Sequence, residues 1–201
     1  MSRKRVLDLV LLVPLLPFFA GLIGVLALLV WALDGRPIFF TQPRLGRHRR
    51  GFRILKLRTM TCEPDVRART VTRSGRWLRQ RGLDELPQLF NVLLGDMSLV
   101  GPRPLEEKDA TRLTALHQAF DARFDATPGL TGLAQVCQAR GAQLTAQLDA
   151  WYARHQSVVL DLSILLRTAL MNVVGKQRAT LTVRPEFMTL SPAGTTREHQ
   201  G

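Results

Sequence analysis

Cysteine and histidine are scarce in this chain, which has 201 residues but only two cysteines and four histidines. None of them has the close spacing that zinc ligands or a disulfide scaffold require. They are Cys62, Cys137, His48, His117, His155 and His199. The sequence therefore indicates neither a zinc site nor a disulfide framework, and two free thiols fit a reducing compartment.

Acidic residues are almost missing from one segment. The chain has 28 Lys and Arg against 16 Asp and Glu, which gives a net charge of +12. Between Arg36 and Arg81 there are 14 basic residues, opposed only by Glu63 and Asp65, so this segment carries the whole excess. A localised basic block favours an anionic partner, such as lipid headgroups, nucleic acid or a phosphorylated substrate. A solvated basic surface is the plainer interpretation.

Aromatic residues are thin within this basic block, and no nucleic-acid-binding module is recognisable there. The aromatic residues of the block are Phe39, Phe40, Phe52 and Trp77. We therefore expect no nucleic acid among the partners. A non-catalytic, membrane-attached basic protein that binds anionic lipid or nucleic acid is kept as the alternative to an enzyme.

Charge is absent from residues 9–33, which are almost entirely apolar. At about 1.5 Å per residue, a helix of this length can cross a bilayer. A signal peptide is disfavoured, because the apolar run exceeds a usual signal-peptide core and no A-x-A cleavage site closes it. The segment is therefore expected to be a membrane helix.

The flanks of this segment are basic on both sides. Arg3, Lys4 and Arg5 precede it, and six arginines follow it within twenty residues. The positive-inside rule favours the cytoplasm for both flanks. A re-entrant hairpin satisfies that preference and one straight span does not. Pro14 and Pro17 favour a bend inside the run, although proline in membrane helices often only kinks them, so a single span stays open.

A second apolar stretch covers residues 157–175. On a helical wheel several of its polar residues, together with Arg154 just before it, fall along one narrow stripe, and Arg167 lies off it. The stripe consists of Arg154, Ser157, Asp161, Thr168 and Asn172. A helix this apolar is either buried in the core or lies in the membrane interface, and the sequence leaves both open.

The middle of the chain mixes short strands with helices. We expect strands at residues 37–42 and 52–59, and helices at residues 73–81, 83–94, 105–124 and 144–155. A stripe at helical spacing in the third of these helices is expected to be core: Leu113, Leu116, Phe120 and Phe124. The sequence thus predicts an α+β fold that is mostly helical, with a small β element.

The densest chemical signal is the stretch LDELPQLFNVLLGDMSLVGPRP, residues 83–104. Gly82 is expected to end the preceding helix, and Pro87 to lie in the first turn of the next. Asp84 and Glu85 then start that helix, where free backbone N–H groups and the helix dipole favour carboxylates and phosphates.

Two adjacent acids at such a position suit a nucleophile and a Mg²⁺ ligand, because Arg79, Arg81 and Arg103 are close in sequence to oppose a phosphate's charge. Plain helix capping by the two acids is the alternative.

This stretch resembles the signature of the bacterial sugar transferase family, the monotopic phosphoglycosyl transferases. Further blocks resemble the family in the same order: FTQ at residues 40–42, KLRTM at 56–60 and PGLTGLAQV at 128–136. The resemblance covers roughly residues 4–174, and many ordered blocks make it more specific than one short motif. The chain departs from the family pattern at Gly82 in place of Ser, Leu133 in place of Trp and Cys137 in place of Asn. It also has Ala20-Gly21 where the family often bends its membrane helix at a Ser-Pro pair, so a bend at Pro14 and Pro17 and a bend at Ala20-Gly21 both stay open.

The resemblance implies an N-terminal re-entrant membrane helix at residues 1–35, a catalytic domain with interfacial amphipathic helices at residues 36–175, and a polar tail at residues 176–201. It implies transfer of a sugar 1-phosphate from a UDP-sugar to undecaprenyl phosphate, with release of UMP. The expected location is the bacterial inner membrane, in contact with its lipid, with the active site on the cytoplasmic face.

The resemblance also implies roles for single residues. Asp84 resembles the family's nucleophile, which forms a phospho-aspartyl sugar, and Glu85 its partner. Both are expected to hold Mg²⁺, the implied cofactor. The implied substrate-binding residues are Arg58, Arg79, Arg103 and Asp161.

Overall fold

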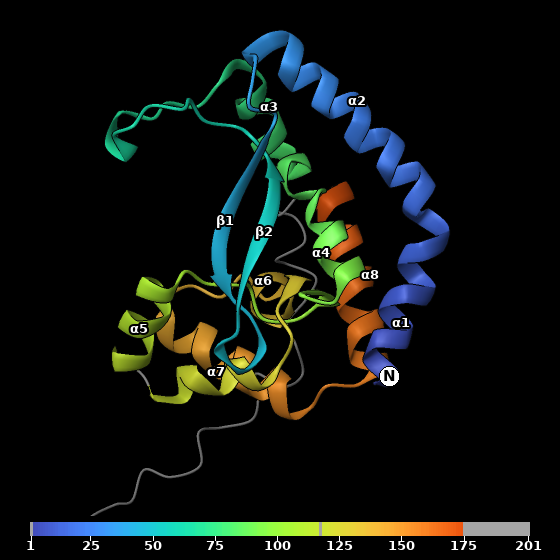
Figure 1. Cartoon of the computed structure of the whole chain (residues 1–201). Coiled ribbons are helices and arrows are strands. Elements are labelled where there is room, and N and C mark those ends of the chain that lie inside the picture. Colours follow the sequence, from blue (N-terminus) through green and yellow to red (C-terminus); the bar gives the residue numbers. More distant parts are fainter. Residues whose placement is uncertain (1, 117, 175–201) are drawn as a thin grey trace, which may run out of the picture.

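The computed structural model of the chain describes residues 2–116 and 118–174, so the predicted tail at residues 176–201 lies outside the described part (Figure 1). Helices dominate and strands are few, which confirms the predicted mostly helical α+β class. The helices are α1 (Arg3–Leu12), α2 (Leu16–Asp34), α3 (Arg73–Arg81), α4 (Gln88–Leu94), α5 (Glu107–Leu116), α6 (Leu133–Val136), α7 (Ala142–Arg154) and α8 (Val158–Val174). The strands are β1 (Phe39–Leu45), β2 (Gly51–Leu57), β3 (Ser98–Val100) and β4 (Gly129–Thr131).

The apolar N-terminal segment forms one helical arc, Arg3–Asp34, which in length and composition could cross a membrane. The arc departs from α-geometry at the 3-10 turn η1 (Val13–Leu15), which contains Pro14. There the Leu16 N–H bonds back to the Val13 carbonyl. Helices α1 and α2 run in different directions on either side of this turn (Figure 1).

One face of the arc packs on the rest of the protein and the other is exposed. Leu12, Ile23, Leu26 and Val30 are buried, whereas only 17% of the most apolar window lies inside the protein. A core helix of a water-soluble protein would be mostly covered. The outer face is therefore apolar surface without protein cover, and includes Val10, Val13, Leu15, Phe18, Val25, Leu28, Trp31 and Leu33.

Strands β1 and β2 form the predicted hairpin, in antiparallel register from Phe39 opposite Leu57 to Leu45 opposite Gly51. Ile54 and Leu57 are buried and hold β2 against the helices. The strands are shifted by a few residues from the predicted ranges.

The predicted helix over residues 83–94 is wrong in its first half. Residues 83–85 form the 3-10 turn η4 (Leu83–Glu85), and α4 begins only at Gln88. Pro87 donates no backbone hydrogen bond, so the regular α-helix starts after it. Gly82 ends α3 as predicted, with a left-handed φ of 67° that glycine adopts without strain.

The parallel pair β3–β4 was not predicted. It brings the loop after β3 close to residue 129: a Cβ on Gly101 would lie 2.8 Å from the backbone nitrogen of Gly129. Only glycine permits this approach. The contact fixes the start of the Gly101–Pro104 turn that carries Arg103.

The predicted helix over residues 105–124 is also wrong as a single element. Helix α5 ends at Leu116, and the 3-10 segment η5 (Gln118–Asp125) follows. Phe120 and Phe124 are buried as expected, but Leu116 is 64% exposed.

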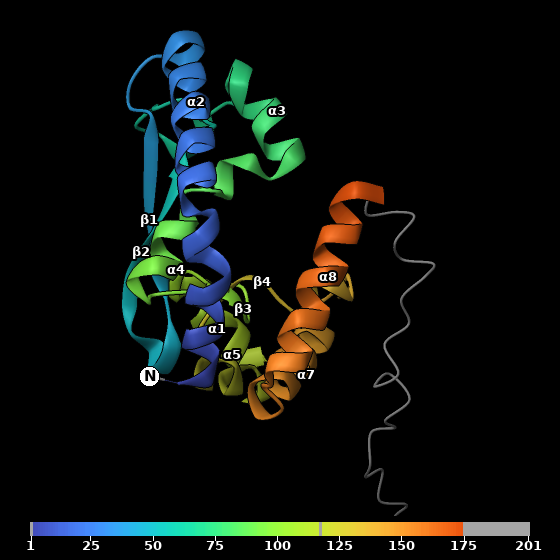
Figure 2. The same cartoon turned by 90° about the vertical axis from the view of Figure 1, so that its right-hand side faces the viewer.

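Helices α7 and α8 confirm their predictions within two residues. In Figure 2, α3 and α8 lie to the right of α2. One face of α8 is buried in the core at Ile164, whereas Val159, Leu166 and Leu170 are at least half exposed. The predicted place of this helix in the membrane interface stays a prediction.

Candidate active site

Asp84 is held in the tight turn η4 between α3 and α4. The Glu85 N–H bonds to the Gly82 carbonyl at 3.3 Å, and the Leu86 N–H bonds to the Leu83 carbonyl at 3.3 Å. The Asp84 residue is only 9% exposed. The turn therefore presents two adjacent acids from a fixed backbone.

Glu85 is clamped by two cations that are distant in sequence. The Lys56 Nζ of β2 lies 2.7 Å from Glu85 Oε1, and Arg103 Nη2 lies 2.8 Å from the same oxygen. Burial acts to raise the pKa of Glu85, but Arg103 and Lys56 outweigh it and hold that pKa below its ordinary value. Glu85 is therefore held as an anion.

The pKa of Asp84 moves in the opposite direction. Burial raises it most and the charge of Glu85 adds to this, while Lys56 and Arg79 act to lower it. Neighbouring carboxyls whose pKa values are driven apart are typical of catalytic pairs. A higher pKa also makes the Asp84 carboxylate a stronger nucleophile once it is ionised.

Arg79 and Arg103, predicted from sequence, do lie with the two acids. Arg79 donates from Nε to Thr59 Oγ1 at 2.8 Å, and its charge acts on Asp84. Arg103 reaches Glu85 from the turn after β3. The cluster of Lys56, Arg79, Asp84, Glu85 and Arg103 is called the acid–base cluster below.

Arg58 and Asp161, the other two residues predicted to bind substrate, contact residues outside the acid–base cluster. Arg58 is 7% exposed and donates to the Asp34 and Gly35 carbonyls at the end of α2, the latter at 3.0 Å. Asp161 on α8 pairs with Lys4 at 2.6 Å and accepts a hydrogen bond from the Tyr152 hydroxyl at 2.6 Å. Both residues tie the ends of the N-terminal arc to the body of the protein.

Lys56 is the residue that sequence reasoning missed. It stands in the KLRTM block, from which only Arg58 was assigned a role. In the structure Lys56 contacts Glu85, while Arg58, two residues on, turns to α2. Lys56 and Glu85 are 29 residues apart in the sequence. Their contact therefore becomes visible only once β2 is known to pack against the turn that follows α3.

A groove of about 970 Å³ lies beside the cluster. Glu85 and Arg103 line it, whereas Asp84 does not. Apolar side chains make up much of its wall, among them Leu86, Leu99, Leu130, Leu165 and Met171. A ligand with a charged part and an apolar part would fit such a wall.

Within the described residues, no three His, Cys, Asp or Glu side chains gather as a metal site. Asp84 and Glu85 are nevertheless a fitting pair for Mg²⁺, which commonly binds one or two carboxylates and completes its shell with water and substrate phosphates. These two residues would hold it.

Comparison with known proteins agrees with this geometry. The profile of the family described as bacterial sugar transferase matches residues 1–175. A UDP-glucose:undecaprenyl-phosphate glucose-1-phosphate transferase of Caulobacter vibrioides is 45% identical over 181 residues, which cover 83% of this chain and 68% of that protein. An uncharacterized sugar transferase, EpsL, of Bacillus subtilis is 41% identical over 177 residues, covering 84% of this chain and 86% of that protein.

Some relatives are much longer. An undecaprenyl-phosphate glucose phosphotransferase of Komagataeibacter xylinus is 43% identical over 191 residues, which cover 84% of this chain but only 35% of that protein. The chain thus covers from 35% to 86% of the length of these three relatives. The family match extends over all of the described residues, and this chain belongs to the bacterial sugar transferase family.

Proposed function

We propose that this protein is a phosphoglycosyl transferase that moves a sugar 1-phosphate from a UDP-sugar to undecaprenyl phosphate. The observation that carries the proposal is the acid–base cluster: a buried Asp84 beside an ionised Glu85, surrounded by three cations at the edge of a groove. The printed activities of the Caulobacter and Komagataeibacter relatives support the substrate class.

In the proposed first step, an Asp84 carboxylate oxygen attacks the sugar-bearing phosphorus of the UDP-sugar. A bond forms between that oxygen and phosphorus, and the bond to the bridging oxygen breaks, so UMP leaves with the electron pair. Lys56, Arg79 and Arg103 oppose the negative charge of the diphosphate, which would otherwise repel a carboxylate. Mg²⁺ held by Asp84 and Glu85 would supply further neutralisation of that charge.

In the proposed second step, a phosphate oxygen of undecaprenyl phosphate attacks the phospho-aspartyl sugar. The new phosphorus–oxygen bond joins the two phosphates, and the bond to Asp84 breaks and restores its carboxylate. The groove wall, with Leu130, Leu165 and Met171, suits the apolar part of such a lipid.

We expect a trappable intermediate. The detergent-solubilised protein, given Mg²⁺ and one of a panel of UDP-sugars but no lipid, should release about one equivalent of UMP and gain the mass of one sugar phosphate less water. Adding undecaprenyl phosphate should then give turnover with ping-pong kinetics. UMP release and intact-protein mass spectrometry measure both results.

Two outcomes would contradict the proposal. Turnover with sequential kinetics and no adduct would favour direct transfer in a ternary complex. Absence of UMP with every UDP-sugar would favour the alternative of a non-catalytic protein that binds anionic lipid. Against that alternative, several arginines of the basic block already have partners within the protein, including Arg44, Arg49 and Arg79.

We also propose that the arc Arg3–Asp34 is re-entrant and enters and leaves one leaflet. At about 1.5 Å per residue its 32 residues extend about 48 Å, well beyond the hydrocarbon thickness of roughly 30 Å. Both ends contact the same body: Arg5 donates to the Leu93 carbonyl at 2.6 Å, and Arg58 to the Gly35 carbonyl at 3.0 Å. A straight span would require that body on both sides of the membrane.

The position and chemistry of the bend support the same proposal. The arc departs from α-geometry at η1 beside Pro14, whereas α2 is continuous through Ala20 and Gly21. Unpaired backbone groups in hydrocarbon cost several kcal/mol each. The 3-10 bond from the Leu16 N–H to the Val13 carbonyl reduces that cost.

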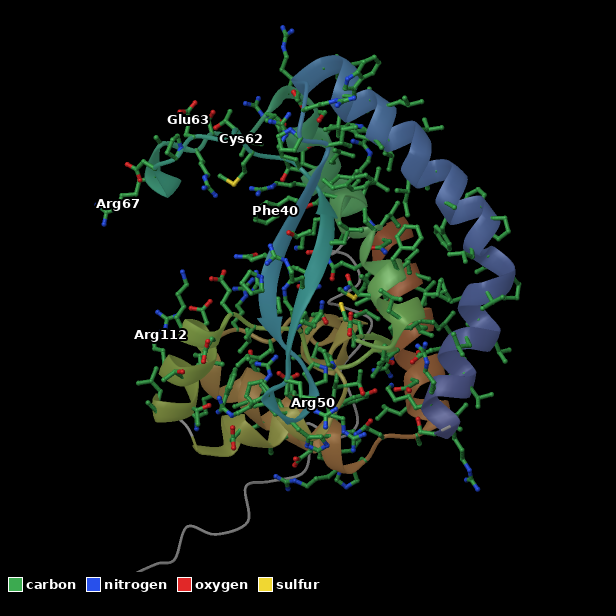
Figure 3. All side chains as sticks on the ribbon, in the orientation of Figure 1. Phe40, Arg50, Cys62, Glu63, Arg67 and Arg112 are labelled. Carbon is green, nitrogen blue, oxygen red and sulfur yellow. The ribbon has the colours of Figure 1, made fainter. Side chains whose placement is uncertain are left out.

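We place the active site on the cytoplasmic face of the inner membrane, where the exposed apolar rows of α2 and α8 contact lipid. The topology is testable because Cys62 is naturally exposed on a projecting loop (Figure 3). With Cys137 replaced by Ser, Cys62 reports on the catalytic body. Ser2→Cys in a background lacking both native cysteines reports on the N-terminus.

Neither cysteine should react with a membrane-impermeant thiol reagent in intact spheroplasts, and both should react once the inner membrane is opened. Labelling of one position but not the other in intact spheroplasts would mean that the chain crosses the membrane once. Labelling of both would move the catalytic body to the outer face.

A further inference from the structure

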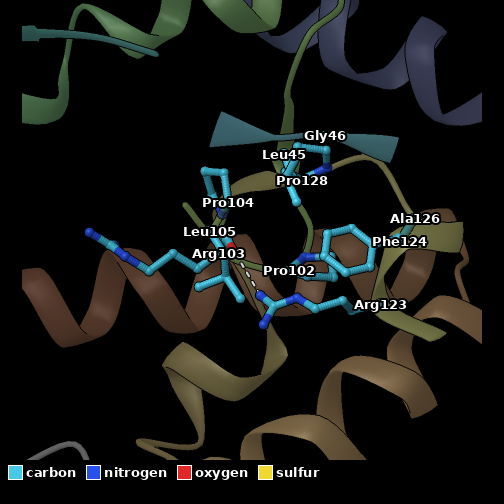
Figure 4. Close-up of a pocket in the computed structure, with 10 residues that line it drawn as sticks. All are labelled: Leu45, Gly46, Pro102, Arg103, Pro104, Leu105, Arg123, Phe124, Ala126 and Pro128. Atoms are coloured by element: carbon cyan, nitrogen blue, oxygen red, sulfur yellow. Dashed lines mark hydrogen bonds between the residues drawn. The ribbon is translucent and has the colours of Figure 1, made fainter. Parts of the chain in front are cut away.

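Arg123 is a buried cation next to the acid–base cluster, on η5. The residue is 3% exposed. Its Nη2 donates to the backbone carbonyl of Arg103 at 2.5 Å, as Figure 4 shows. The same nitrogen lies 3.2 Å from Asp149 Oδ2 on α7, and the guanidinium stacks 4.6 Å from the centre of the Phe120 ring.

This ion pair is a poor source of stability. Both side chains are 3% exposed, so both ions lose their hydration, and such pairs often stabilise no better than apolar residues of the same size. Burial lowers the pKa of Arg123, and it raises the pKa of Asp149 to about 6 although Arg123 acts to lower it. The pair is therefore better explained by what it holds in place.

What Arg123 holds is the turn that presents Arg103. Pro102 and Pro104 flank Arg103 and have no backbone N–H, so this turn has few donors of its own. Arg103 has a side chain that is 53% exposed and whose Nη2 reaches Glu85 at 2.8 Å. An exposed arginine keeps such a contact only if its backbone is fixed at the right distance.

We propose that Arg123, held by Asp149, is a positioning residue for the transfer reaction: it fixes the backbone of Arg103, and thereby the guanidinium that faces Glu85 and the groove. This inference rests on the proposed function. Arg123 and Asp149 also line the groove, but the proposed action of Arg123 is through Arg103 rather than through contact with the reacting atoms.

The test removes both buried charges together, so that no ion is left unpaired. The double variant Arg123→Met with Asp149→Leu should fold, and its kcat/KM for the UDP-sugar should fall on the order of 10- to 100-fold, because a misplacement of about 1 Å is enough for such a loss. Arg123→Lys should recover part of the activity. Arg112→Met, on the surface of α5 with a side chain that is 71% exposed, is the matched control and should behave as the parent.

The decisive readout is the coupling between the variants in kcat/KM for the UDP-sugar. Arg103→Met should lower kcat/KM on its own, because it removes the guanidinium that contacts Glu85. If Arg123 acts through Arg103, adding the double variant to Arg103→Met should lower kcat/KM no further.

The NMR signal of the Arg103 side-chain Nε–H gives the same answer without activity: it should shift in the double variant, because the guanidinium loses its fixed place against Glu85. An unshifted Arg103 signal, with the losses in kcat/KM of the double variant and of Arg103→Met simply adding, would overturn the inference. Absence of UMP release by the parent would instead reject the proposed function, and the NMR signal would still decide the role of Arg123.

Discussion

Replacing Asp84 with Asn is expected to abolish UMP release, with a loss of roughly a thousandfold or more. An amide nitrogen or oxygen cannot form the acyl phosphate that the proposed first step requires. The variant should nevertheless fold at least as stably as the parent. Asp84 is buried beside Glu85, and both conditions raise its pKa, so removing its charge relieves a cost.

Because activity should be lost while stability is kept, the test separates a catalytic role of Asp84 from a structural one. Thermal unfolding should show an unchanged or higher Tm for Asp84→Asn, while the mass adduct without lipid should vanish. Asp125→Asn is the matched control, because Asp125 is an exposed carboxylate at the end of η5. Robust turnover by Asp84→Asn, or an adduct that persists, would remove Asp84 from the nucleophile role.

Local sequence signals predicted the parts of the fold that local forces determine. The structure has helices α3, α7 and α8 within two residues of the predicted ranges. Gly82 was predicted to end α3 for a conformational reason, and its left-handed φ bears this out. Asp84 and Glu85 were found because adjacent acids stand between basic residues in a dense motif.

What the sequence did not predict depends on contacts between distant segments. The pair β3–β4 has three residues in each strand, too few for a periodic pattern, and joins segments some thirty residues apart. Lys56 and Arg123 likewise reach the site through contacts between segments that are far apart in the sequence. The break before α4 was missed because apolar spacing continues across η4, although Pro87 and the acids favour a tight turn.

Asp161 also has contacts that the sequence did not predict. The resemblance implied a role in substrate binding, and the structure gives this residue partners within the protein. In the structure its carboxylate joins Lys4 at 2.6 Å to the Tyr152 hydroxyl at 2.6 Å. Tyr152 is fully buried, and burial together with the hydrogen bond to Asp161 raises its pKa, so the hydroxyl stays protonated as a donor. This network joins the start of α1 to α7 and α8.

Asp161→Asn is therefore expected to lower stability strongly. Loss of one partner of a buried ion pair typically costs about 3–5 kcal/mol, because the other charge is left buried without compensation. For a protein of this size that corresponds to a fall in Tm on the order of 10 °C, measurable by thermal unfolding in detergent. The folded fraction should keep a KM for the UDP-sugar near that of the parent.

The matched control is Asp109→Asn, since Asp109 forms an ion pair with Arg112 at 3.4 Å on the exposed surface of α5. Surface pairs contribute about 0–1 kcal/mol, so this variant should unfold near the parent's Tm. A stable Asp161→Asn protein with a greatly raised KM would instead support the substrate-binding role. Loss of stability with an unchanged KM would show that Asp161 acts by anchoring α1, and with it the membrane helix, to the catalytic body.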